Sequence, residues 1–139
     1  MTREELLSQI ALGDDICRYL MSDVHSADFL ATEMAGLANS EGGVIFIGVW
    51  DSRTVSGLSQ RNVSRINKLI KNAASQQVRS PLVVRTENVL LENGRIVIVL
   101  TVPQGIDKPY FDKNGVIWLK CGADKRRVNT KEELRRLFQ

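Results

Sequence analysis

The side chains whose types first suggest chemistry are lysines and arginines in the last third of the chain. The densest cationic run is Lys125-Arg126-Arg127, which follows three isolated lysines. Adjacent cations repel one another unless a polyanion neutralises them, and such side chains commonly contact nucleic-acid phosphates. We therefore predict a nucleic-acid-binding surface formed by Lys108, Lys113, Lys120, Lys125, Arg126 and Arg127.

Aromatic residues are interleaved with these cations, and a second cationic set lies earlier in the chain. Tyr110, Phe111 and Trp118 are of the kind that stack on unpaired bases, but we interpret Phe111 and Trp118 as core residues. The second set lies on one predicted helix and consists of Arg61, Arg65, Lys68 and Lys71. Whether the two sets meet in the fold stays open from the sequence.

The positive charge is concentrated in the second half of the chain. Residues 1–60 carry three arginines against nine acidic residues, a net charge of −6. Residues 61–139 carry sixteen lysines and arginines against seven acidic residues, a net charge of +9. A basic half favours DNA or RNA as a partner through phosphate contacts. The alternative is a solvated surface on which the two halves interleave.

Composition excludes several classes of protein. The two cysteines, Cys17 and Cys121, indicate no disulfide framework, and we expect reduced thiols in a cytoplasmic protein. A single histidine, His25, argues against sites that need several imidazoles. No apolar run is long enough to cross a bilayer, so we expect no membrane partner. Neither glycine-rich nucleotide-binding spacing occurs, and we predict no ATPase machinery, no cofactor, no metal and no catalytic residue.

Apolar spacing and turn residues predict an α+β fold. Thr2 and Thr130 each precede a glutamate by three residues, which is the spacing of a helix capping box. The predicted helices are 2–12, a segment opening at Ser26 or Asp28 and running through Ala38, 60–77 and 131–138. The predicted strands are 16–21, 44–50, 54–58, 82–91, 95–102, 110–111 and 116–120, with 122–129 as a basic loop.

These elements predict how the domain is built. The segment 44–50 is continuously apolar, which is typical of a central strand covered on both faces. The pair Asn93-Gly94 predicts a tight hairpin between two strands. Helices come early and late with hairpins between them, which indicates a mixed or antiparallel sheet with helices packed on it. No linker interrupts the pattern, so 1–139 is predicted as a single domain.

Two sequence blocks resemble a known family. The first is Ala38-Asn39-Ser40-Glu41-Gly42-Gly43, an apolar strand, then Gly48-Val49-Trp50-Asp51 and Val55-Ser56-Gly57-Leu58. The second is Lys108-Pro109-Tyr110-Phe111 followed by the stretch from Gly115 to Gly122. Both resemble the Schlafen Alba-type domain, also described as a divergent AAA-type DNA-binding domain. The resemblance implies nucleic-acid binding, as in bacterial transcriptional regulators and RecG-related proteins labelled as helicases.

The chain departs from the family at the acidic residues. Schlafen-type nucleases carry an acidic trio that can hold a divalent metal. Here Arg18 stands where the family has a glutamate, while Asp14 and Asp51 match the other two positions. An arginine would compete with a metal for the same carboxylates, which argues against a competent nuclease. We interpret Asp51 as a turn residue that accepts backbone hydrogen bonds.

Three functions stay open at this stage. The favoured one is a nucleic-acid-binding module, with DNA as the expected target, which regulates transcription or accompanies a helicase. The second is a metal-dependent endoribonuclease that uses Asp14 and Asp51. The third is a protein-interaction module, and a homo-oligomer is compatible with each.

Overall fold

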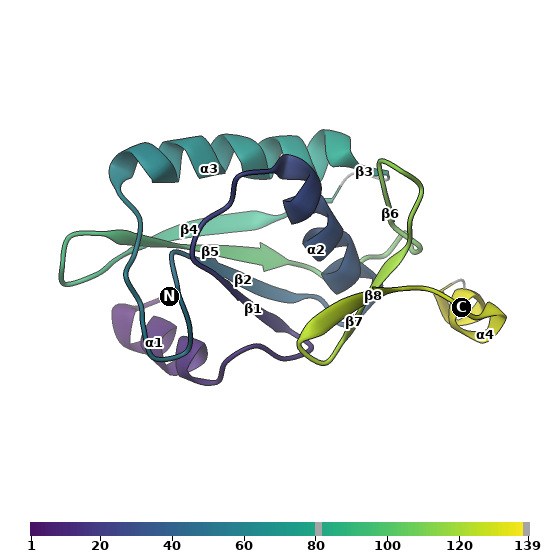
Figure 1. The fold of residues 1–139 in the computed structure, drawn as a ribbon, viewed down its shortest axis with the longest axis horizontal. Helices are drawn as coiled ribbons and strands as arrows, with labels where there is room; N and C mark the ends of the chain where they lie inside the picture. The colour runs from purple at the N-terminus through teal and green to yellow at the C-terminus, as the bar shows by residue number, and fades with distance from the viewer. Residues whose placement is uncertain (80–81, 138–139) are drawn as a thin grey trace.

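The fold is built on a four-stranded sheet whose two faces are both covered by helices. The computed structural model describes residues 1–79 and 82–137. The strand order is β1-β2-β5-β4, in which β1 and β2 are parallel and the other neighbours are antiparallel. The strands are β1 (Arg18–Met21), β2 (Gly43–Ile47), β4 (Arg85–Leu90) and β5 (Ile96–Val102). The prediction of an α+β fold is confirmed (Figure 1).

The helices begin where side-chain caps predict. Thr2 and Thr130 accept hydrogen bonds from the backbone N–H of Glu5 and Glu133, both at 3.1 Å, and Ser26 caps the second helix in the same way. The helices are α1 (Arg3–Ala11), α2 (Ala27–Asn39), α3 (Gln60–Asn72) and α4 (Lys131–Leu137). One π-helical turn, η1 (Ala73–Gln77), extends α3. Phe138, predicted in the last helix, lies outside the described residues. Within the described part of the chain, no helix has the length and apolar character of a membrane span.

Two apolar layers hold the sheet between the helices. Ile45 and Ile47 of β2 face the layer formed with α2 and α3, whereas Phe46 faces α1. All three side chains are fully buried. Because successive side chains of a strand point to opposite faces, burial on both sides requires a continuously apolar segment. The predicted central strand is therefore confirmed, although it ends at Ile47.

The prediction of a basic loop at 122–129 is wrong, because the central half of this segment forms a strand. β8 (Asp124–Arg127) pairs with β7 (Trp118–Cys121), and Gly122 adopts a positive φ of 63° in the turn. All four residues of β8 are charged, so the sequence has no alternation of apolar and polar residues from which this strand could be predicted. A second small sheet joins β3 (Val78–Arg79) to β6 (Phe111–Asp112). The strands predicted at 110–111 and 116–120 pair with each other only through one isolated bridge, between Phe111 and Ile117.

The strand predicted at 54–58 is also wrong. Gly48 has a φ of 107°, which turns the chain out of the sheet directly after β2. Only an isolated bridge joins Asp51 to Thr54, and Leu58 pairs with Ile96 of β5 instead. The segment is therefore a loop that returns to the central strands. Its tip presents Trp50 and Asp51 beside the end of β1, because the N–H groups of Gly48 and Val49 donate to the carbonyl of Met21.

Candidate nucleic-acid interface

The strands that carry the predicted cations are anchored to the end of α2. The Asn39 side chain is buried, and its Nδ2 donates to the carbonyl oxygens of Tyr110 and Trp118, both at 2.9 Å. Its Oδ1 accepts from the Tyr110 N–H at 2.7 Å. The Ser40 hydroxyl accepts from the Lys120 N–H at 2.9 Å. Two polar residues at the helix end therefore set the position of β7 and β8.

Strand geometry divides the cationic run between two sides of the hairpin. Lys125 and Arg127 both lie over the Trp118 ring, 5.2 Å and 5.5 Å from its centroid. Arg126 points the other way and forms an ion pair with Glu133 of α4. Because side chains alternate along a strand, three adjacent cations cannot form one cluster here. The triplet therefore does not act as the single patch that a loop would allow.

Two of the six predicted cations are engaged inside the protein. The Lys125 Nζ lies 2.8 Å from Glu33 Oε1 and 4.5 Å from the centroid of the Phe29 ring, and its side chain is 17% exposed. Lys120 is buried, and its Nζ donates to the Ala123 carbonyl at 2.8 Å. Each ammonium group therefore already has a hydrogen-bond acceptor within the protein. Neither lysine is free to meet a phosphate in this arrangement.

The two remaining lysines have partners on α2 and on the residue that caps its C-terminus. Lys113 Nζ lies 2.6 Å from Asp28 Oδ2, but both side chains are about half exposed, at 47% and 52%. Lys108 Nζ donates to the Ser40 carbonyl at 3.3 Å. The six predicted residues therefore do not gather at one point. Exposed ion pairs are weak, so Lys113 can still exchange its carboxylate for a phosphate.

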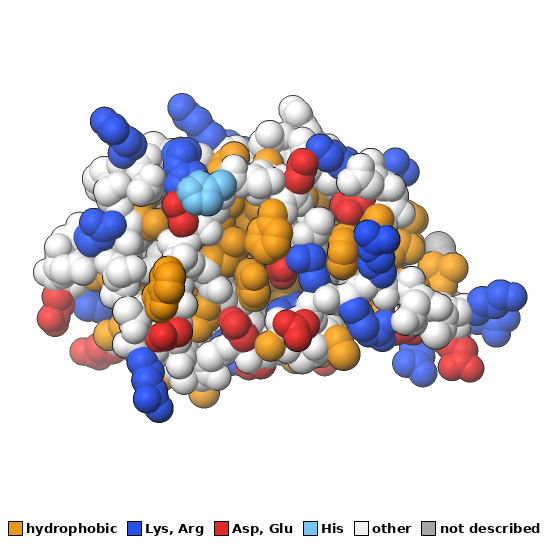
Figure 2. Space-filling view, viewed as in Figure 1, with side chains coloured by type: hydrophobic (Ala, Val, Ile, Leu, Met, Phe, Trp, Pro, Cys, Tyr) orange, Lys and Arg blue, Asp and Glu red, His pale blue; other side chains and the backbone are white. Residues whose placement is uncertain are grey.

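A groove between the β7–β8 hairpin and α4 brings Arg127 next to a cation that the prediction missed. We call it the hairpin groove, and its lining consists of Gly115, Val116, Ile117, Arg127, Val128, Asn129, Thr130, Lys131 and Leu134. It contains two cations, an amide and a hydroxyl, and its lining contains no carboxylate. Lys131 comes four residues after Arg127 in the sequence. This closeness to the cationic run could have indicated that Lys131 belongs to the same surface. Figure 2 shows lysine and arginine side chains over β6, β8 and α4.

The second cationic set lies on α3, whose C-terminal end leads through η1 to β3 and β6 (Figure 1). Arg61, Lys68 and Lys71 are exposed, and Figure 2 shows cations along this edge. Arg65 is held inward, because its guanidinium donates to Asp23 Oδ1 at 2.6 Å and to the Val24 carbonyl. None of the four residues of the α3 set lines the hairpin groove.

Comparison with known families decides the relationship that the glycine blocks suggested. Residues 18–129 match the family described as Schlafen, AlbA_2. The chain belongs to this family. The matched region begins with β1 and extends past β8, so it includes Arg127 of the hairpin groove but not Lys131.

Two solved structures share the fold of this Schlafen AlbA_2 domain. The DIP2311 protein from Corynebacterium diphtheriae has a TM-score of 0.62 and 18% identity, and the alignment covers 96% of this chain and 30% of that one. The N-terminal domain of a protein named as an ATP-dependent DNA helicase RecG-related protein from Nitrosomonas europaea has a TM-score of 0.59 and 21% identity. That alignment covers 94% of this chain and 91% of the other. The chain thus spans under a third of the DIP2311 protein. Comparison with curated proteins gave no match.

The carboxylates that a Schlafen-type nuclease would use have structural hydrogen bonds in this domain. Asp14 Oδ1 accepts from the Leu20 N–H at 2.7 Å. Asp51 Oδ1 accepts from the N–H groups of Arg53 and Thr54, both at 2.8 Å, as predicted for a turn aspartate. Arg18 pairs with Asp15. Among residues 1–79 and 82–137, no three acidic, histidine or cysteine side chains converge in a metal-binding cluster.

Asp112 ties the Trp118 side of the hairpin to the turn before it. Burial favours the neutral carboxyl, but hydrogen bonds from Trp118 Nε1 and from the N–H groups of Val116 and Asn114, all at 2.9 Å, outweigh burial. The pKa of Asp112 is therefore lowered from its ordinary value of 3.8. The carboxylate thus fixes the ring on which Arg127 lies.

A lowered pKa predicts acid sensitivity of this region. The stabilisation from Asp112 is complete above pH 3.8 and is lost as the pH falls through the lower folded-state pKa. We expect Asp112→Asn to be less stable than the parent at neutral pH and to lose less stability on acidification. Urea unfolding of both proteins at about pH 7 and about pH 3 measures the difference. Equal losses in parent and variant would contradict this role.

Proposed function

We propose that this Schlafen AlbA_2 domain binds nucleic acid, with DNA as its expected target, and serves as a regulatory or helicase-associated module. The observation that carries the proposal is the hairpin groove, where Arg127 and Lys131 lie together without a lining carboxylate. Membership of the family and the name of the Nitrosomonas protein support the same class of partner.

The groove suits phosphate better than bases. Arg127 is exposed, and its guanidinium lies 5.5 Å from the Trp118 centroid, so the planar group is already oriented when a ligand arrives. An oriented guanidinium loses less conformational freedom on binding a phosphate. Asn129 and Thr130 add neutral donors to the same lining. This set recognises a backbone rather than a base sequence, so binding should depend strongly on salt.

Removing the two groove cations should reduce the salt dependence of binding. For Arg127→Ala with Lys131→Ala, we expect the slope of log affinity against log salt to fall by about two, since each phosphate contact contributes about one. Fluorescence anisotropy of a labelled DNA duplex, titrated at several salt concentrations from about 50 to about 200 mM, measures the slope.

A matched variant on α3 separates the two cationic surfaces. Lys68→Ala removes an exposed cation of the α3 set and should leave the slope unchanged. If Lys68→Ala lowers the slope and the groove variant does not, phosphate binding belongs to α3. Binding that is independent of salt, or absent for DNA and RNA alike, would reject the proposed function.

A further inference from the structure

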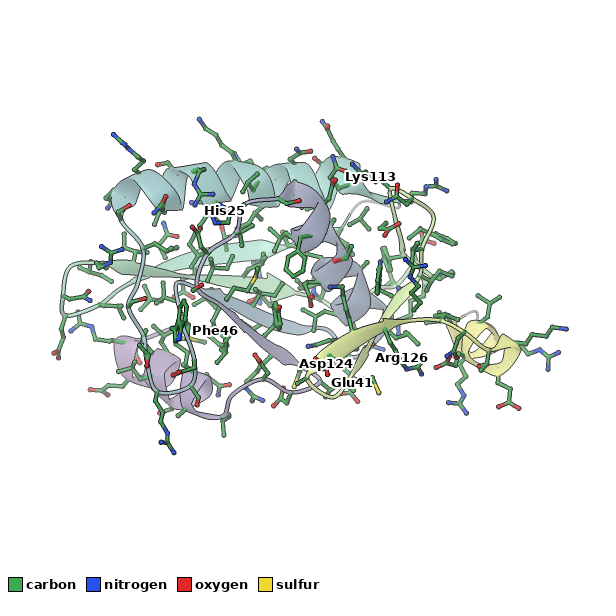
Figure 3. All side chains as sticks on the ribbon, viewed as in Figure 1. His25, Glu41, Phe46, Lys113, Asp124 and Arg126 are labelled. Carbon is green, nitrogen blue, oxygen red and sulfur yellow. The ribbon has the colours of Figure 1, made fainter. Side chains whose placement is uncertain are left out.

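A second hollow, lined by aromatic rings, runs along β1 on a different part of the surface. Two adjoining depressions share Tyr19 and Phe29, so they form one trough. Its lining includes Tyr19, Asp23, Phe29, Trp50, Glu33 and Asp124. These residues come from β1, α2, the loop after β2 and the β7–β8 hairpin. Figure 3 places Lys113 beside the start of α2 and Asp124 near the tip of the hairpin.

Trp50 is the most exposed aromatic side chain of the trough, although its backbone is firmly held. Trp50 is 71% exposed and Phe29 is 42% exposed. The Trp50 N–H donates to the Thr54 carbonyl at 2.9 Å, and Asp51 closes the turn with two further hydrogen bonds. Exposure of an indole ring to water is unfavourable in the free protein. An exposed indole on a rigid turn is therefore typical of a surface that contacts a partner.

The charges around the trough indicate what it can accept. Two lining acids already have cations, since Asp23 pairs with Arg65 and Glu33 pairs with Lys125. Among the lining acids of the described chain, Asp124 alone has no ion pair. A basic peptide would therefore find few free carboxylates.

A ligand with a flat, neutral group and a phosphate beside it suits the trough better than a basic peptide does. Arg53 is exposed in the same turn as Trp50, and within the described residues it forms no ion pair. Glu33 Oε2 is buried and has no hydrogen-bond donor. Amino and imide N–H groups of nucleobases supply such a donor once the Lys125 side chain shifts from Phe29, whereas an apolar side chain does not.

We propose that the trough binds unpaired nucleotides, with bases stacked on Trp50 and Phe29 and a phosphate held by Arg53. This inference rests on the proposed function and adds the class of nucleic acid, a single-stranded segment. The hairpin groove then contacts the backbone of the same ligand or of an adjoining duplex. Stacking on aromatic side chains tolerates any base, so sequence preference should be weak.

Trp50 fluorescence tests the inference directly. The chain has only two tryptophans, Trp50 and Trp118, so a variant that lacks Trp50 shows how much of the signal comes from that residue. Titration with single-stranded oligothymidine should quench the emission of the parent protein. Quenching should disappear in Trp50→Phe while most of the affinity remains, because a phenyl ring still stacks. Trp50→Ala should weaken single-strand binding about 5- to 100-fold. Its affinity for a duplex of equal length should change less than about twofold.

Ile106→Ala is the matched control, since Ile106 is fully exposed and lies outside the trough. It should leave both affinities unchanged. Single-strand affinity that survives Trp50→Ala overturns the inference, and so does quenching by an oligoarginine peptide in place of the oligonucleotide. If duplex binding persists with its Arg127 dependence in these cases, the inference alone fails. If neither nucleic acid binds, the proposed function fails as well.

Discussion

Replacing Asn39 by alanine should lower the free energy of unfolding by about 3 to 5 kcal/mol, because two buried hydrogen bonds and one partly buried hydrogen bond are lost together. The backbone N–H and carbonyl of Tyr110 and the carbonyl of Trp118 would each lose their partner. A buried backbone group without a partner keeps the full cost of its desolvation. The same change should loosen β7 and β8 and thereby displace Arg127 from the hairpin groove.

Urea unfolding measures this effect, and two further variants sharpen it. Asn88→Ala removes an exposed asparagine from β4 and should change stability by less than about 0.5 kcal/mol. Asn39→Asp keeps the acceptor but loses both donated hydrogen bonds, so it should also destabilise the domain. A loss below about 1 kcal/mol for Asn39→Ala would show that α2 does not anchor the hairpin through this side chain.

Gly42→Ala should be the second strongly destabilising change, at about 3 kcal/mol or more. Gly42 has a φ of 74°, and its N–H donates to the Leu37 carbonyl at 2.7 Å where α2 ends. A Cβ at this position would lie 2.5 Å from the Gln104 nitrogen and 2.9 Å from the Pro103 carbonyl carbon. Both are backbone atoms, so no side-chain rotation relieves the overlap.

Gly94→Ala distinguishes the cost of steric overlap from the cost of a positive φ. Gly94 has a similar φ of 83°, but a Cβ there would meet nothing within 4 Å. Its replacement should therefore cost only about 1 kcal/mol, which is the penalty of the left-handed conformation. Thermal or urea unfolding of both variants gives the difference. Equal losses would mean that the loop carrying Pro103 and Gln104 moves away without cost.

These two predictions give a physical reason for the block that identified the family. Asn39 and Gly42 belong to the segment 38–43 and act on different partners, the hairpin and the loop after β5. Neither residue lines the hairpin groove or the trough. The block therefore maintains the framework on which both proposed nucleic-acid contacts depend.

Local features of the chain determined much of the fold. Thr2 and Thr130 begin helices as their spacing predicts, because a cap needs only the backbone three residues ahead. Ser26, one of the two predicted starts of the second helix, is its cap. The Asn93-Gly94 turn joins β4 to β5, since its geometry is likewise local. The continuous apolar run of β2 indicated its central place without knowledge of its neighbours.

The distribution of usable charge was decided by the tertiary structure alone. Glu33 meets Lys125 across 92 residues of sequence, and Asp28 meets Lys113 from a different element. Strand alternation then sends Arg126 to Glu133 and leaves Arg127 over Trp118. The sequence by itself determined how many cations the second half carries. Which of them face solvent without a carboxylate depends on partners that only folding brings within a few ångströms, where charge pairing acts.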